Sequence, residues 1–337
     1  RSEKASPKRQ RCFAEMADKP SRALVVYGDG LMRGLKAATA TSHHLDSLAS
    51  LSSCGFLSLP NATPSESSEE RVGREFALLL DACDYTTGEL AASATISERF
   101  MGMKMAVITS SPSVKSLCDK LSVTVFRLDE LTNNKGSADE VTDELLKFLG
   151  FKEGQILEPP EFDIVFVHLH DGSAKGVSFC LENMNNIIEH VLHKGYPGSP
   201  IGSRLHLSVL MSFGHVTDDD RVKYSIKTLR NEKNPIRSAI FPQQSHMMRG
   251  ETLRSDVRLY CPILMAQWQY AVTRKDLAEK FSFDEFKEVG WICDIWVCLI
   301  GCDYDVVLQN GGTLVIPVDR FIHEVAFKMW KAPKYGA

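Results

Sequence analysis

The chain has 337 residues, of which 44% are hydrophobic and 24% are charged, and its formal net charge is -4 at pH 7. These proportions are typical of a globular protein with a large core, built as one domain with an insertion or as two domains. A chain without a basic surplus lacks the electrostatic footprint of a nucleic-acid-binding protein. We therefore exclude nucleic acid as the main partner and expect a small molecule or a protein.

Cysteine spacing and hydropathy indicate a protein of a reducing compartment. The nine cysteines are odd in number and form no Cys-x-x-Cys pair, which favours free thiols and a cytoplasmic or nuclear location. The most apolar segment, Trp291–Leu308, is interrupted by Asp294, Asp303 and Asp305. Because charged side chains are costly inside a bilayer, we expect no membrane span there and no membrane partner.

Residues 1–19 are predicted to lie outside the fold. The segment is polar, begins with basic residues and has no apolar stretch, so it has neither the pattern of a signal peptide nor that of a core element. We expect a disordered or non-native tail, with the folded core beginning at residue 20.

The first predicted strand, Ala23–Tyr27, is apolar almost throughout and runs into Gly28-Asp29-Gly30. A buried strand that ends in a carboxylate places a hard oxygen ligand at the carboxyl edge of a sheet, where open α/β folds hold their ligands. Asp29 is therefore a candidate metal ligand. The alternative is that it caps the following turn or helix. An amphipathic stretch follows at Ser42–Gly55.

Residues 61–135 are predicted to form a small inserted α/β lobe. After a polar loop, a helix begins near Arg71, and a strand–helix–strand unit follows with strands at Met105–Ile108 and Val123–Phe126. A unit of this spacing is typical of βαβ structure. We accordingly assign the core to residues 20–60 and 136–337.

Helices and strands continue to alternate in the rest of the core. The pattern predicts helices at Ala138–Gly150 and Val177–His193, and strands at Phe162–His168 and Leu205–Ser212. A strand without polar alternation is typical of burial on both faces, so the alternation predicts a mainly parallel sheet flanked by helices. Residues 290–309 interrupt this pattern and are predicted to be an insertion within the core.

With these elements in order, the chain resembles the alkaline phosphatase-like superfamily, and within it the cofactor-independent phosphoglycerate mutases of the archaeal type. The resemblance rests on Tyr27–Gly30, on Ser42–Ala49 with the strand at Cys54–Leu57, and on Asp163–Gly172. It covers most of residues 22–286 as a pattern and implies an alkaline phosphatase-like core that carries the inserted lobe. A shared fold does not by itself establish shared chemistry.

The resemblance also implies a site for two divalent metals and a serine or threonine that accepts phosphate. Two metals stabilise both the attacking and the leaving oxygen, so the number of ligands decides whether this chemistry survives. Candidate ligands for Mn, Mg or Zn are Asp29, His168, His170, Asp171 and His215. The histidines and Asp171 stand at altered spacing, and Phe213 and Gly214 offer no ligand, which predicts a degenerate metal site. Hydrogen bonding is the alternative role for histidines at strand ends.

Two serines and two arginines complete the set of candidate site residues. Ser65 and Ser67 are candidate phosphate acceptors, although their loop is polar and acidic. Arg249 and Arg254 lie in a basic stretch that can face an anion, and a surface loop without such a role is the alternative.

These residues leave two functions open. The first is a pseudoenzyme related to the phosphoglycerate mutases, which binds a phosphorylated ligand or a protein partner and needs no cofactor. The second is an active, divalent-metal-dependent phosphomutase or phosphohydrolase that uses a loop serine. Metal content and turnover of a phosphate ester separate the two.

Overall fold

The computed structural model describes residues 20–35, 43–61, 66–84, 94–128, 130–131, 138–152, 155–170, 172, 176–226, 248–249, 252–254, 256–270, 273–289 and 315–333. The predicted tail 1–19 and the predicted insertion 290–309 lie outside these residues.

Strands and helices alternate along most of the described chain. The strands are β1 (Arg22–Asp29), β2 (Ser53–Ser58), β3 (Met105–Ile108), β4 (Thr124–Phe126), β5 (Phe151–Lys152), β6 (Gln155–Ile156), β7 (Ile164–His170), β8 (Leu205–Met211), β9 (Met248–Arg249), β10 (Thr252–Leu253), β11 (Ile263–Trp268) and β12 (Val315–Pro317). The helices are α1 (Met32–Leu35), α2 (His43–Leu51), α3 (Ser68–Leu79), α4 (Ile96–Arg99), α5 (Pro112–Lys120), α6 (Ala138–Phe148), α7 (Gly176–Lys194), α8 (Pro200–Arg204), α9 (Asp218–Lys223), the 3₁₀ turn η2 (Val318–Arg320) and α13 (Phe321–Lys328).

The main sheet confirms the predicted α/β class. Its eight described strands run in the order β12-β2-β11-β8-β1-β7-β3-β4. Only β11 among them is antiparallel to its neighbours, β2 and β8. In the middle of the sheet, β1 pairs in parallel with β7 and with β8, and Asp29 stands opposite His170. The carboxyl ends of β1, β7 and β8 therefore meet at one edge.

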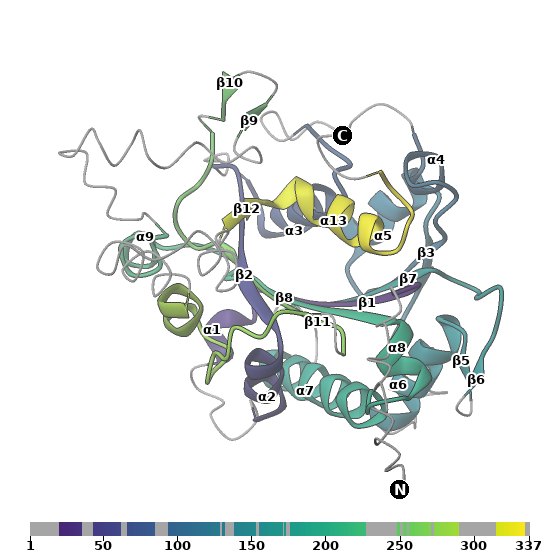
Figure 1. Cartoon of the computed structure of the whole chain (residues 1–337). Helices are drawn as coiled ribbons and strands as arrows, with labels where there is room; N and C mark the ends of the chain where they lie inside the picture. Colours follow the sequence, from purple (N-terminus) through teal and green to yellow (C-terminus); the bar gives the residue numbers. More distant parts are fainter. Residues whose placement is uncertain are drawn as a thin grey trace, which may run out of the picture.

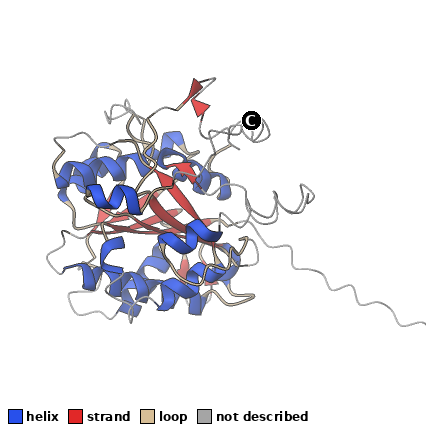
Figure 2. Cartoon of the chain, turned by 90° about the vertical axis from the view of Figure 1, so that its left-hand side faces the viewer, coloured by secondary structure: helices blue, strands red, loops and turns tan. Residues whose placement is uncertain are grey.

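Helices cover both faces of this sheet (Figures 1 and 2). On one face, Leu24 and Val26 of β1 join a core that includes side chains of α2, α6 and α7. On the other face, Val25 and Tyr27 pack in a second core with side chains of α3, α5 and α13. This double burial explains why the first strand is apolar without alternation.

The structure differs from the sequence prediction in the segment 61–135. Its strands β3 and β4 do not form a sheet of their own, because β3 pairs in parallel with β7 and extends the main sheet. Helices α3 and α5 contribute to the core on one face of that sheet. Periodicity predicted the strands correctly but could not indicate which partner they pair with.

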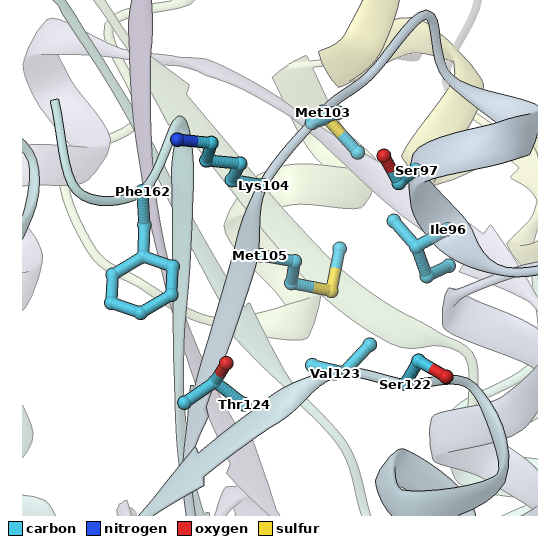
Figure 3. A pocket seen from close by; sticks show the side chains of 9 residues that line it. All are labelled: Ile96, Ser97, Met103, Lys104, Met105, Ser122, Val123, Thr124 and Phe162. Carbon is cyan, nitrogen blue, oxygen red and sulfur yellow. The ribbon is translucent and has the colours of Figure 1, made fainter. Parts of the chain in front are cut away.

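A shallow hollow of about 230 Å³ lies at the amino ends of β3 and β4 (Figure 3). Its lining includes Met103, Met105, Phe162 and Lys104. Since β3, β7 and β1 are parallel, this hollow is at the opposite edge of the sheet from Asp29.

No helix within the described residues is both long and apolar enough to cross a bilayer.

Candidate functional site

The carboxyl edge of the sheet gathers polar side chains from four parallel strands. Asp29 ends β1 and His170 ends β7. Ser212 directly follows β8 and Thr109 directly follows β3. Gly30 has a φ of 76°, a backbone conformation that favours glycine, where the chain turns from β1 towards α1. The fold therefore brings together residues that are up to 183 positions apart in sequence.

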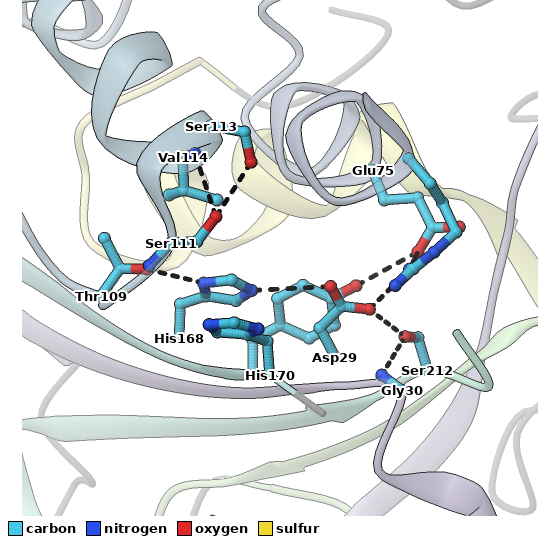
Figure 4. Close-up of polar contacts among 12 residues, drawn as sticks. Asp29, Gly30, Glu75, Thr109, Ser111, Ser113, Val114, His168, His170 and Ser212 are labelled. Atoms are coloured by element: carbon cyan, nitrogen blue, oxygen red, sulfur yellow. Dashed lines mark hydrogen bonds and ion pairs between the residues drawn. The ribbon is translucent and has the colours of Figure 1, made fainter. Parts of the chain in front are cut away.

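Asp29 is fully buried at the centre of this cluster (Figure 4). Its Oδ1 accepts hydrogen bonds from Arg71 Nη1 at 2.7 Å and from Ser212 Oγ at 2.9 Å. Ser212 Oγ in turn accepts a hydrogen bond from the backbone N–H of Gly30 at 2.9 Å. The second carboxylate oxygen, Oδ2, lies 3.7 Å from His168 Nε2. Asp29 is thus paired with a fixed cation from its own chain.

Helix α3 supplies that cation. A capping box fixes the start of the helix: the side chain of Ser67 accepts from Glu70 N–H, and the side chain of Glu70 accepts from Ser67 N–H. Arg71 follows in the first turn, and its Nη1 also donates to Glu75 Oε2 at 3.1 Å. Tyr27 Oη donates to the same Glu75 oxygen at 3.4 Å. Two buried carboxyl groups therefore share one guanidinium.

Burial and charge act differently on the two carboxyl groups. Burial by itself raises the pKa of Asp29, but the neighbouring His168 and the Arg71 guanidinium outweigh it and hold that pKa well below its usual range. Burial raises the pKa of Glu75, and the charge of Arg71 only partly opposes this effect. Asp29 is thus the ionised partner of Arg71, and Glu75 takes up a proton more readily.

His168 and His170 lie side by side on the face of β7 that carries α3 and α5. Their rings stack with centroids 5.6 Å apart and planes inclined by 12°. His168 Nδ1 is 2.9 Å from Thr109 Oγ1, and its ring is fully buried. His170 Nε2 is 3.2 Å from Ser110 Oγ, in the loop that leads into α5. The first histidine belongs to the interior of the cluster and the second to its accessible rim.

The other predicted site residues lie elsewhere or have other contacts. His215 is exposed, and its backbone carbonyl accepts a hydrogen bond from Arg33. Ser67 caps α3, and Arg254 is buried against Asp319 with 2.7 Å between Nη2 and Oδ2. Ser65, Asp171 and the side chain of Arg249 lie outside the described residues.

The described residues do not fit a two-metal centre. Among them, no group of three or more histidine, cysteine, aspartate or glutamate side chains is arranged to hold a metal ion. Asp29 Oδ2 and His168 Nε2 are both buried without a hydrogen-bond partner in the described part of the chain. These two atoms could together contact a single small ion or a water molecule. The positive charge next to the carboxylate, however, is already provided by Arg71.

Sequence reasoning missed Arg71, Glu75, Ser212, Thr109 and Ser110. One local signal was present, because an arginine four residues before a glutamate predicts a contact along a helix face. The contact of Arg71 with Asp29 joins residues that are 42 positions apart and depends on how α3 packs on the sheet.

Of three comparisons with known proteins, only the search of solved structures finds similar ones. A scan of protein-family models finds no match, and a search of curated proteins finds none. Among solved structures, the PH0037 protein from Pyrococcus horikoshii is similar over 94% of this chain and 99% of its own, with 12% identity and a TM-score of 0.50. A cofactor-independent phosphoglycerate mutase from Thermoplasma acidophilum matches 72% of this chain and 40% of its own, with 11% identity and a TM-score of 0.34.

A protein in the alkaline phosphatase superfamily from Vibrio parahaemolyticus covers 76% of this chain and 62% of its own, with 10% identity and a TM-score of 0.41. At these identities the likeness concerns the fold and not the reaction.

Proposed function

We propose that this protein is a catalytically depleted, alkaline phosphatase-like relative of the phosphoglycerate mutases, and that it binds a phosphorylated small molecule at the carboxyl edge of its sheet. The observation that carries the proposal is the buried ion pair between Arg71 and Asp29. The carboxylate expected to be the first metal ligand is held at 2.7 Å by a guanidinium with 10% of its side chain exposed.

The ion pair argues against two-metal catalysis on physical grounds. A metal ion next to Asp29 would have to displace Arg71 or share the carboxylate with it, and either arrangement places like charges close together in a buried site. Breaking a buried ion pair costs about 3–5 kcal/mol. Arg71 also contacts Glu75 on its own helix, so its departure would leave a second buried carboxyl group without its partner.

The loop before α5 supports phosphate as the recognised group. Its sequence, Thr109-Ser110-Ser111-Pro112-Ser113, places hydroxyl groups at the beginning of a nine-residue helix. Ser110 is exposed and Ser113 is partly exposed, and the Ser113 hydroxyl lies 2.9 Å from that of Ser111. Helix N-termini and hydroxyl groups are ordinary partners of phosphate oxygens. His170, beside Ser110, adds a donor that carries positive charge once it is protonated.

Metal content and turnover of a phosphate ester test whether the protein has lost the metal site and its catalytic activity. Protein purified from medium with added Mn²⁺ and Zn²⁺ would be analysed for bound metal and assayed with p-nitrophenyl phosphate. We expect less than one metal ion per chain and no turnover above the blank. Two tightly held ions per chain, with turnover that disappears in Asp29→Ala, would establish the alternative of an active metal-dependent phosphomutase or phosphohydrolase.

Thermal stabilisation by inorganic phosphate and by glycerol phosphate tests the binding. A ligand at 100 times its Kd stabilises a protein by about 2.7 kcal/mol, so a shift of several degrees is measurable. We expect Ser113→Ala to weaken the stabilisation. The matched control is Ser97→Ala, because Ser97 lines the hollow at the opposite edge. Equal stabilisation of both variants would contradict the proposed location.

A further inference from the structure

The rim of the carboxyl edge holds a serine and a histidine within hydrogen-bond distance. Ser110 Oγ and His170 Nε2 are 3.2 Å apart; Ser110 lies in the loop after β3, and His170 is the last residue of the adjacent strand β7. We propose that Ser110 and His170 are a nucleophile and a general base for acyl transfer from a carboxylic ester or thioester. This activity needs no metal and goes beyond the binding function proposed above.

The exposure of the two side chains suits this role. Ser110 is exposed, and His170 is partly exposed while its neighbour His168 is buried. A substrate can therefore reach Ser110 Oγ from solvent, whereas the base is anchored on its inner side. In a nucleophile and base pair, the two side chains lie at about 2.6–3.2 Å and a third group orients the base.

Two features orient the imidazole of His170. Its ring stacks on that of His168, which is itself fixed by the contact of its Nδ1 with Thr109 Oγ1 at 2.9 Å. On another side, a Cβ atom added at Gly172 would lie 3.2 Å from His170 Nδ1 and 3.5 Å from its Cε1. Any larger residue at position 172 would therefore press on the ring. His168 and Gly172 act as positioning residues.

The charges at this edge favour an acyl group over a phosphoryl group as the electrophile. Phosphoryl transfer needs cations that neutralise the transferred oxygens. Arg71 is committed to Asp29 and Glu75, and its side chain is largely buried. An ester carbonyl is uncharged and develops a single negative charge during attack. The start of α5, next to Ser110, has the polarity that stabilises one such charge.

The reaction is balanced without any further reactant except water. Ser110 Oγ bonds to the carbonyl carbon while its proton passes to His170 Nε2. The bond from that carbon to the alcohol or thiol then breaks, and the leaving group takes the proton from Nε2. Water hydrolyses the Ser110 ester in the same way, with His170 again accepting and returning one proton.

Acylation of the purified protein by p-nitrophenyl acetate tests the proposal. We expect a burst of p-nitrophenol, one acetyl group per chain by intact mass, and its location on Ser110 by peptide mapping. Ser110→Ala should abolish the adduct, and His170→Gln should slow acylation by about 100-fold or more. Matched controls are Ser97→Ala and His193→Gln, at an exposed serine and an exposed histidine away from this edge.

A positioning variant separates this mechanism from a serine that is merely exposed. Gly172→Ala should lower the acylation rate and alter its pH profile, while leaving the thermal stability close to that of the wild type. No adduct in the wild-type protein, an adduct on another residue, or an unchanged rate in His170→Gln would each overturn the proposal. A protein that phosphate stabilises but that p-nitrophenyl acetate does not acylate would leave the binding function standing and refute this activity.

Discussion

Replacing Arg71 with methionine should destabilise the protein far more than replacing an exposed arginine. Nη1 of Arg71 makes two charge-assisted hydrogen bonds, to Asp29 at 2.7 Å and to Glu75 at 3.1 Å, and the exposed fractions of the two carboxyl side chains are 0% and 1%. At about 1.5–3 kcal/mol for each bond to a charged group, their loss amounts to about 3–6 kcal/mol. Breaking a buried ion pair typically costs about 3–5 kcal/mol. We therefore expect Arg71→Met to lower the free energy of unfolding by about 4 kcal/mol.

Urea unfolding with linear extrapolation measures this loss. The matched control is Arg33→Met, because Arg33 contacts Asp220 but leaves 42% of its side chain exposed, and exposed pairs contribute about 1 kcal/mol or less. In a background with Asp29→Asn and Glu75→Gln, the cost of Arg71→Met should shrink by at least about 2 kcal/mol. A cost below about 1 kcal/mol in the wild-type background, or an unchanged cost in the neutral background, would refute the reasoning.

The pH dependence of this loss has a definite sign. The folded-state pKa of Asp29 is depressed, so its contribution to stability is present above the unfolded pKa of about 3.9 and is lost as the pH falls towards the folded value. Without Arg71, the pKa values of Asp29 and Glu75 both rise, and the buried carboxyl groups can be neutralised by protons. The difference in stability between Arg71→Met and the wild type should therefore be largest near neutral pH and smaller near pH 4.

Three further predictions concern other parts of the fold. Ser67→Ala should destabilise the protein by roughly 1 kcal/mol, through loss of the α3 cap, without changing phosphate binding, as urea unfolding and thermal shifts would show. Burial lowers the pKa of Lys328 to about 8, so reductive ¹³C-methylation followed by NMR titration should reveal, besides the α-amino group, a lysine midpoint near pH 8 that Lys328→Arg removes; if the signal that Lys328→Arg removes has a midpoint near 10, the prediction is wrong. Gly150→Ala should cost more than Gly102→Ala in thermal unfolding. Both positions have a positive φ, but only at 150 would the added Cβ meet a backbone oxygen, that of Leu157, at 2.8 Å.

The sequence predicts a strand or helix correctly where the hydrophobic pattern of that element reflects its own burial. The uninterrupted apolar segments that lead to Asp29 and to His168 predicted two strands correctly, and the structure pairs these strands with each other. The antiparallel direction of β11 and the pairing of β3 with β7 were not predictable, because both depend on which strand lies alongside. The site was predicted only in part for the same reason. Asp29 Oδ2 and His168 Nε2 lie 3.7 Å apart because both residues stand near the carboxyl ends of adjacent strands, whereas Arg71 reaches Asp29 through helix packing.

The position of β1 in the sheet has a consequence for how the chain is made. The partners of β1 are β7, which begins at Ile164, and β8, which begins at Leu205. About 135 residues separate Asp29 from the start of β7, so a ribosome that adds about 5–20 residues per second leaves this apolar strand without a partner for roughly 7 to 27 seconds. Nascent chains that stop before residue 205 should be captured by chaperones or aggregate, while chains extended past β8 become resistant to protease. Among the described strands of the main sheet, β1 comes first in sequence, yet both strands that flank it are made later.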